Sequence, residues 1–342
     1  MSWFKATGGA LRAAVLAAVM AGSPVISLAQ SSGVPVGEKI KIGTINILTF
    51  SSIYVAKELG YFADEGLDAE LFETTSGTNL NAALLGGSIV ATASGYTQPL
   101  IMAEKGKALQ SLVGLEMASP YVFIARPNLA IPVDDPKGMA SMLKGKRFCV
   151  VSIGSTGHKT AEGLLAEHGL KSDDVIWVSV GTGSGALAAL QTGAIDIMDP
   201  TEPDVTRILE AGAALVVLDL RTTKAAPNFS NIPTTTVQAT TDWIKANPKT
   251  AAAIVRAIAR ADKTLREDSE ASLKVLAKLY PAVAPDKLKA MYDVTKGNFR
   301  AEITREKFDL AQKAYLDWGI ITKPARYGDV TSVQFEPLWF VR

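Results

Sequence analysis

The chain contains an internal repeat, and this repeat limits its fold more than any other feature. A shift of 103 residues aligns the start of the first copy with the second, and a shift of 106 residues continues the alignment. The pairs are Thr49 with Ser152, Ser52 with Ser155, Gly66-Leu67 with Gly169-Leu170, Ser76-Gly77-Thr78 with Thr182-Gly183-Ser184, Leu84 with Leu190, Gly87 with Gly193, Ile89 with Ile195, and Ser94-Gly95-Tyr96 with Pro200-Thr201-Glu202. Two similar units are therefore expected, with a binding cleft that both of them line.

Each copy alternates strands and helices. In the first copy the pattern predicts strands at 39–48, 69–74 and 89–93, with a helix after each of the first two. Gly66 ends the first of these helices, and Gly86-Gly87 ends the second. Such an order is typical of a doubly wound, mainly parallel α/β sheet, whose ligand site lies beyond the carboxyl ends of the strands.

The second copy opens with FCVVSIGSTGHKTAE, from Phe148 to Glu162. The apolar run 148–151 predicts a buried strand, and a helical pattern starts after Ser155 and Thr156. A helix N-terminus presents unpaired N–H groups and a partial positive charge, so it attracts anions. Two interpretations are open at this point, an ordinary turn with a capping serine and an anion site.

The remaining segments connect and extend the two units. Residues 121–125 and 234–240 predict two extended strands that cross between domains. Helices are expected near 248–265, 269–279, 285–294 and 304–318, packed on the first unit, and the tail 334–342 is apolar enough to dock. We therefore predict domain I at 39–120 plus 238–342 and domain II at 121–237.

The N-terminus has the features of a secretory signal peptide. Lys5 and Arg12 precede an apolar run at 13–21, and Ser27-Leu28-Ala29 supplies small residues at a cleavage site. The run is shorter than the about 20 residues that span a bilayer. Residues 1–29 are therefore predicted to be removed, leaving a soluble monomer in the periplasm.

Composition excludes several classes of function. Without Lys5 and Arg12 the chain has 33 basic and 34 acidic side chains, so no nucleic-acid partner is expected. Cys149 is the only cysteine and cannot form a disulfide within the chain; we interpret it as a buried apolar residue. One cysteine and two histidines supply neither a metal cluster nor a nucleophile with its base, so no cofactor and no catalysis are expected.

One motif favours an enzyme. Gly181-Thr182-Gly183-Ser184-Gly185-Ala186 follows a predicted strand, opens a helix and fits a dinucleotide fingerprint, and Asp199 stands about 20 residues further on. The repeat pairs this loop with Ser76-Gly77-Thr78, which lacks the full set of glycines, and an exported protein has little access to the cofactor. A dinucleotide-binding enzyme is therefore the less favoured alternative.

The chain resembles a known family at several ordered motifs between Lys39 and Trp318. They are Ile53-Tyr54-Val55-Ala56, Gly60-Tyr61-Phe62-Ala63-Asp64-Glu65-Gly66-Leu67-Asp68, Leu84-Leu85-Gly86-Gly87-Ser88-Ile89-Val90-Ala91, Gly154-Ser155-Thr156, and Leu190-Gln191-Thr192-Gly193-Ala194-Ile195-Asp196. The family is that of the periplasmic solute-binding proteins of ABC importers for taurine, alkanesulfonates, nitrate and thiamine precursors. The resemblance implies a type II two-domain clamp, with two crossing strands as hinge, that delivers a small solute to an inner-membrane permease.

The resemblance also implies which residues contact the ligand. They lie in the loops after the strands: Thr49, Phe50, Ser51, Ser52, Ser94, Gly95, Tyr96, Ser155, Thr156, Thr201 and Glu202. We expect a sulfonate or carboxylate; a thiamine-precursor pyrimidine is the alternative, and a cytoplasmic thiamine-precursor synthase is a relative that the signal peptide argues against. No arginine stands in these loops, so neutral donors must hold an anion.

Single residues leave further choices. The family commonly has an acid three residues after the helix-ending glycine, and here Val90 takes that place in the first copy while Asp196 keeps it in the second. Phe50 and Tyr96 either enclose a ligand or pack in their own domain, and Glu202 either accepts from a ligand N–H or satisfies a loop. A solvated side chain is predicted for His158, and structural roles for Asp196 and Trp177.

Overall fold

The computed structural model describes residues 37–340, so the predicted signal peptide lies outside the described residues. These described residues belong to one compact unit that contains two five-stranded sheets. The first sheet has the order β2-β1-β3-β10-β4, with β1 at Glu38–Thr44, β2 at Leu67–Glu73, β3 at Ala91–Gly95, β4 at Leu109–Gly114 and β10 at Thr235–Thr240. The second has the order β7-β6-β8-β5-β9, with β5 at Val122–Ala125, β6 at Arg147–Val150, β7 at Ile176–Ser179, β8 at Ile197–Met198 and β9 at Leu215–Asp219.

The two sheets repeat one topology. In each, the first three strands are parallel, and the fourth, β10 or β5, is antiparallel to both of its neighbours. The predicted α/β class and the mainly parallel sheets are confirmed. The edge strands β4 and β9 were missed by the sequence prediction, because no repeated motif marks them.

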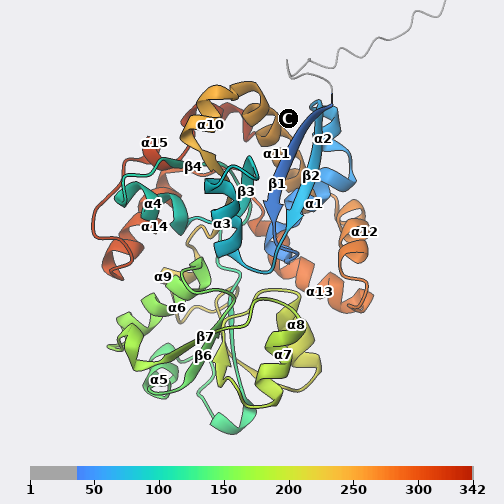
Figure 1. Ribbon diagram of the computed structural model, residues 1–342. Helices are drawn as coiled ribbons and strands as arrows, with labels where there is room; N and C mark the ends of the chain where they lie inside the picture. Colours follow the sequence, from blue (N-terminus) through green and yellow to red (C-terminus); the bar gives the residue numbers. More distant parts are fainter. Residues whose placement is uncertain (1–36, 341–342) are drawn as a thin grey trace, which may run out of the picture. The chain divides into compact units, whose positions relative to one another are not determined.

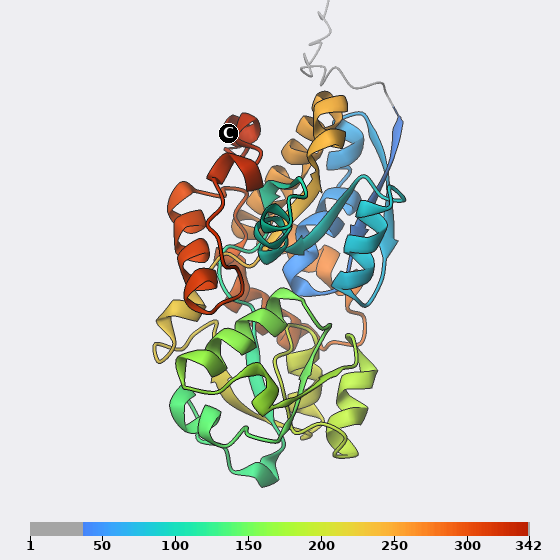
Figure 2. The same ribbon diagram turned by 60° about the vertical axis from the view of Figure 1, so that its left-hand side comes forward.

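Helices flank both sheets. We call the first sheet with its helices lobe 1: α1 at Ser51–Glu58, α2 at Tyr61–Asp64, α3 at Gly77–Leu85, α4 at Thr97–Glu104, α10 at Thr241–Ala246, α11 at Pro248–Glu267, α12 at Ser269–Leu279, α13 at Pro285–Thr295, α14 at Arg305–Asp317 and α15 at Tyr327–Val330. We call the second sheet with its helices lobe 2: α5 at Pro136–Ser141, α6 at Thr156–Glu167, α7 at Ser184–Gln191, α8 at Asp204–Glu210 and α9 at Pro227–Ser230. Helices α10, α11 and α15 follow lobe 2 in the sequence but lie beside the first sheet (Figures 1 and 2).

Alternation along β6 shows how the second sheet is covered on both faces. Phe148 and Val150 belong to the apolar cluster that includes α6, whereas Cys149 belongs to the cluster that includes Ala186 and Leu190 of α7. Successive strand residues point to opposite faces, so both faces of β6 are buried. Cys149 is free and fully buried, as predicted.

Several predicted boundaries are corrected by backbone geometry. The first predicted helix is two helices, α1 and α2, because Gly60 adopts a left-handed conformation with φ 77° between them. The strand predicted at 89–93 is β3 at 91–95, and β1 ends at Thr44 instead of Leu48. The helices predicted near 248–265, 269–279, 285–294 and 304–318 are present as α11 to α14.

The two chain crossings run side by side. Thr234 N–H donates to the carbonyl oxygen of Glu116 (3.2 Å), and Leu115 N–H donates to that of Thr235 (3.1 Å). The strands predicted to cross, β5 and β10, each belong to one sheet and lie next to these crossings. The two crossings are the only covalent links between the described parts of the lobes, and they are hydrogen-bonded to each other. The tail docks as predicted, since Trp339 Nε1 donates to the Leu112 carbonyl (2.9 Å). Within 37–340 no helix is long and apolar enough to cross a membrane.

Candidate functional site

A cavity of about 480 Å³ is lined by residues of both lobes. Its walls are formed largely by the loops that follow β1, β3, β6 and β8, the edge at which parallel sheets bind ligands. The predicted site residues on its wall are Thr49, Phe50, Ser94, Gly95, Ser155, Thr156 and Thr201. The repeat therefore located the cavity, although their contact with a ligand stays a prediction.

Helix α6 begins at the cavity wall. Gly154, with φ 82°, turns the chain out of the preceding loop, and Ser155 Oγ accepts from His158 N–H (3.3 Å), which makes Ser155 the N-cap. The backbone N–H groups of Thr156 and Gly157 have no acceptor in the part of the chain that the structure describes. Unpaired N–H groups at a helix start attract an anion, so both interpretations of this turn hold: it is a capped helix and an anion-attracting one.

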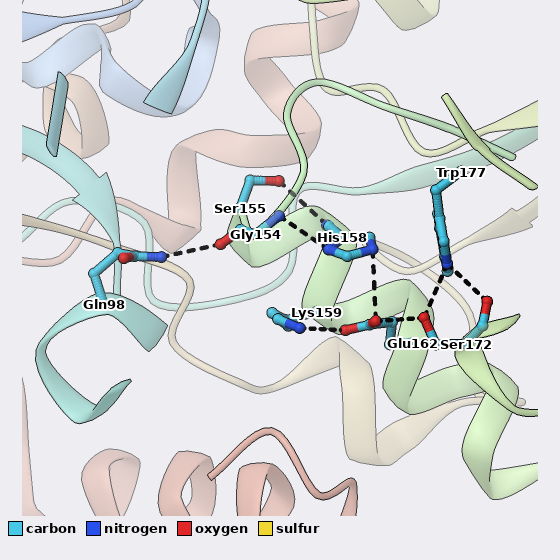
Figure 3. A network of polar contacts seen from close by, with 8 residues as sticks. All are labelled: Gln98, Gly154, Ser155, His158, Lys159, Glu162, Ser172 and Trp177. Atoms are coloured by element: carbon cyan, nitrogen blue, oxygen red, sulfur yellow. Dashed lines mark hydrogen bonds and ion pairs between the residues drawn. The ribbon is translucent and has the colours of Figure 1, made fainter. Parts of the chain in front are cut away.

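A hydrogen-bond network holds this loop in place (Figure 3). Gly154 N–H donates to His158 Nδ1 (3.0 Å), and the His158 ring packs edge-on against Trp177 with centroids 4.5 Å apart. His158 is 5% exposed, so the predicted solvated side chain is wrong. Burial lowers the pKa of His158 and nearby Glu162 raises it; the net direction is down. The network fixes the loop before a ligand arrives, which reduces the entropy lost on binding.

Contacts between the lobes close part of the cavity rim. Thr97 and Thr156 share a hydrogen bond of 2.8 Å between their hydroxyl oxygens. Gln98 Nε2 donates to the Gly154 carbonyl (3.1 Å), which ties α4 to the loop of lobe 2 (Figure 3). Gln98 lines the cavity but was missed by the sequence analysis, since it stands two residues beyond Tyr96, where the loop marked by the repeat ends.

Three other predicted site residues lie away from the cavity wall. Ser52 is fully buried and donates to Asp262 of α11. Ser51 and Tyr96 are also fully buried, and Tyr96 belongs to the apolar core of lobe 1. These three side chains therefore anchor the cavity loops in the interior of lobe 1. Phe50 lines the cavity and also belongs to that core, so packing within lobe 1 and a position beside the ligand are compatible for this side chain.

Glu202 is occupied by protein partners. Arg221 Nη1 donates to Glu202 Oε1 (2.9 Å), and Thr206 N–H donates to Oε2 (3.0 Å). Glu202 is 5% exposed and is not among the residues that line the cavity. These contacts agree with the second of the two roles considered for Glu202, in which its carboxylate accepts hydrogen bonds from neighbouring protein groups and not from the ligand.

Asp196 and its partners form a structural cluster beside β8. Arg147 donates to both carboxylate oxygens of Asp196 from its side chain, and Arg126 donates to Oδ1 (2.8 Å). These hydrogen bonds, led by those from Arg147, lower the pKa of Asp196 to about 2. The structural role predicted for Asp196 agrees with these contacts.

The cavity has charged groups that the site prediction did not include. Lys105, Lys159 and Asp199 line it, and Lys159 Nζ pairs with Glu162 Oε2 at 2.6 Å. Asp199 is 2% exposed, and burial raises its pKa well above the ordinary range. Asp199 stands one residue before Pro200, the first position of the loop that the repeat marks, so the site prediction missed it by one residue. No arginine stands among the described residues of the wall.

Metal binding has no support in residues 37–340, where no group of three or more His, Cys, Asp or Glu side chains is placed to hold an ion. The fingerprint loop 181–186 lies outside the cavity wall, and Gly183 N–H donates to Asp204 Oδ2 (2.7 Å). A backbone group that a dinucleotide phosphate would use is therefore already paired.

Solved structures share this fold. A protein of Bordetella bronchiseptica RB50 is 27% identical, with 82% of this chain and 89% of that chain covered and a TM-score of 0.73. The alkanesulfonate-binding protein of Xanthomonas axonopodis pv. citri bound to MOPS is 17% identical (88% and 99% covered, TM-score 0.69), and the periplasmic nitrate-binding protein of Synechocystis PCC 6803 is 18% identical (89% and 88% covered, TM-score 0.69).

The sequence comparisons give a family. No curated protein sequence matches the chain. A family model does match it over residues 34–280, which is more than half of its length. With a fold shared with periplasmic binding proteins and a cavity at the strand ends of both sheets, the chain belongs to the NMT1-like family.

Proposed function

We propose that this protein is the extracytoplasmic solute-binding component of an ABC importer and that it captures a small organic anion, a sulfonate or a carboxylate, between its lobes. The cavity of about 480 Å³ at the strand ends of both sheets carries the proposal. Its volume lies within the range of small-molecule sites. The structural relatives whose names state alkanesulfonate or nitrate binding support an anionic solute.

The polar groups favour an anion. The free N–H groups of Thr156 and Gly157 supply donors, and the partial charge of α6 and the ammonium group of Lys105 supply positive charge, while Lys159 is paired with Glu162. Ser155 also stands on the wall, and its hydroxyl proton stays available as a donor because Ser155 Oγ accepts in the N-cap hydrogen bond. Neutral donors and a helix start thus take the place that an arginine has in many anion sites.

The apolar wall favours an organic body on that anion. The wall includes apolar side chains from both lobes: Ile45, Ile47, Phe50, Leu85, Ile101, Met102, Tyr121, Val151 and Ile153. Transfer of an apolar group onto such a wall contributes about 25 cal/mol per Å² buried. A nitrate ion would leave most of this wall uncovered, so an alkyl or aryl acid fits it better.

Location, partner and alternatives follow from this role. The predicted signal peptide places the mature chain in the periplasm, where an inner-membrane permease would accept the loaded monomer. We propose binding and not catalysis because Cys149 is buried and His158 is held by its network. A pyrimidine remains a second candidate ligand, since Asp199 could bond a ring N–H. NAD is the least supported candidate, because Gly183 N–H is already paired.

A thermal-shift screen of refolded, ligand-free mature protein tests the function. The probes are benzenesulfonate, taurine, benzoate, nitrate, a 4-aminopyrimidine and NAD. We expect the aryl acids to raise Tm most, because a ligand that binds only the folded state stabilises it by mass action. Small-angle scattering with and without benzenesulfonate reports closure. The proposal fails if no organic acid shifts Tm and scattering shows no compaction.

A further inference from the structure

Asp199 is an unusual group for an anion site. It lies on the cavity wall directly after β8, is 2% exposed, and its Oδ2 makes no hydrogen bond. Ser152 Oγ on the same wall is 5% exposed and also lacks a partner. Buried polar atoms without partners are rare in folded proteins, and on a cavity wall a ligand can supply the missing partner.

The carboxyl of Asp199 lies against the first turn of α6. A β-carbon on Gly157 would stand 2.9 Å from Asp199 Oδ2 and 2.9 Å from the Tyr121 ring, so the carboxyl and the ring each lie close against the helix start. The N–H groups of Thr156 and Gly157, which attract an anion, are in this same turn. An anion bound there would be a neighbour of the Asp199 carboxyl.

No cation neutralises this carboxyl. Among the described residues Asp199 forms no ion pair: Lys159 of the cavity wall is paired with Glu162, and Lys105 of the same wall is not among the groups that shift the pKa of Asp199. The titratable groups whose charges couple to Asp199 are Tyr121 and Cys149. Burial raises the pKa of Tyr121 well above its ordinary value and that of Cys149 to about 12, so both are neutral below pH 9. His158, in the same helix turn, contacts Trp177 and Glu162 instead.

An ionised Asp199 beside a bound anion would repel it across a buried site, where water screens little. A protonated Asp199 removes that repulsion and adds a donor. We propose that Asp199 contacts the solute as a neutral carboxylic acid and donates a hydrogen bond to its acidic group, so that binding of the anion is linked to the proton on Asp199. This inference rests on the proposed function. The burial that raises the pKa of Asp199 acts in the same direction.

The protonation state can be read without a ligand. The infrared spectrum of the ligand-free mature protein at pH 7, minus that of Asp199→Asn, should contain the carbonyl band of a protonated carboxylic acid. Glu116 and Asp262 are buried acids present in both proteins, so their bands cancel in the difference. A difference spectrum with only ionised-carboxylate bands overturns the inference.

The linkage is tested with benzenesulfonate by calorimetry from pH 5 to pH 9. The sulfonate stays ionised throughout, so any pH dependence comes from the protein. We expect Kd of wild type to be constant at low pH and then to rise about tenfold per pH unit above the pKa of Asp199. In Asp199→Asn, whose amide also donates, Kd should be independent of pH.

Two results contradict the inference: the same pH profile in both proteins, or an affinity of wild type that increases with pH. The second would show an ionised Asp199 that accepts from a ligand N–H. If benzenesulfonate binds at no pH, the proposed function fails, and the infrared difference still decides the state of Asp199.

Discussion

The Thr156 side chain of lobe 2 occupies the space where a side chain on Gly95 of lobe 1 would begin. A β-carbon built on Gly95 would lie 1.6 Å from Thr156 Oγ1 and 2.7 Å from its Cβ. Thr156 is the first residue of α6, and Gly95 is the last residue of β3. The lobes can therefore approach this closely only because residue 95 has no side chain.

Gly95→Ala should hold the lobes apart. We expect at least a tenfold rise in Kd for benzenesulfonate, because the clash prevents the Thr156 contact, and a larger radius of gyration by scattering in the presence of ligand. Gly77→Ala is the matched control, since the nearest atom to its new β-carbon is 3.9 Å away, at Ser152 Oγ. An affinity of Gly95→Ala equal to that of the control would show that this contact does not govern closure.

Ser155→Ala combined with Thr156→Ala should weaken anion binding. The double variant removes two hydroxyl groups of the cavity wall and the N-cap of α6, so we expect Kd for benzenesulfonate to rise about tenfold and stability to fall by about 1 kcal/mol. Thr304→Ala is the control: it removes the N-cap of α14, where Thr304 Oγ1 accepts from Lys307 N–H (3.2 Å), away from the cavity. Equal Kd values in both variants would place the anion elsewhere.

Glu202→Ala should affect stability and not affinity. Glu202 is buried with Arg221, so its removal leaves a half-paired guanidinium and a Thr206 N–H without an acceptor. The free energy of unfolding in urea should fall by about 2 kcal/mol, with Kd for benzenesulfonate within about threefold of wild type. Arg221→Ala breaks the same pair from the other side and should behave alike. Loss of affinity in Glu202→Ala alone would return Glu202 to the ligand site.

The buried carboxyl of Glu116 should make a contribution to stability that falls as pH rises toward neutrality. Burial raises the pKa of Glu116, on the first chain crossing, to about 7, although hydrogen bonds from Thr49 and Asn298 oppose this. The unfolded chain releases this proton near pH 4.3, so between about pH 4.5 and 7 the folded state binds more protons, and stability is lost with increasing pH. Burial also raises the pKa values of Asp199 and Asp262, which act in the same direction.

Glu116→Gln isolates the contribution of this one carboxyl. Urea unfolding of wild type and variant from pH 4.5 to 7 should give a smaller decline for the variant, with the difference reaching about 1.4 kcal/mol per pH unit at most. Parallel stability curves for wild type and Glu116→Gln would show that Glu116 is ionised in the folded protein.

The local sequence determined the order of the elements. Glycines at helix ends, apolar runs and the repeat at shifts of 103 and 106 predicted two units of one topology and helices α11 to α14. These features depend on neighbours along the chain, which the sequence shows directly. The same repeat identified the loops whose residues Thr49, Ser94, Ser155 and Thr201 meet at the cavity.

Only the tertiary structure decided what each loop residue faces. Ser52 and Tyr96 lie in predicted site loops but point into the core of lobe 1, and His158 is buried against Trp177. Glu202 pairs with Arg221, which is 19 residues away in the chain, whereas Asp199 lines the cavity and its Oδ2 has no partner. Burial and pairing depend on which distant side chains share a space, and no local pattern encodes that.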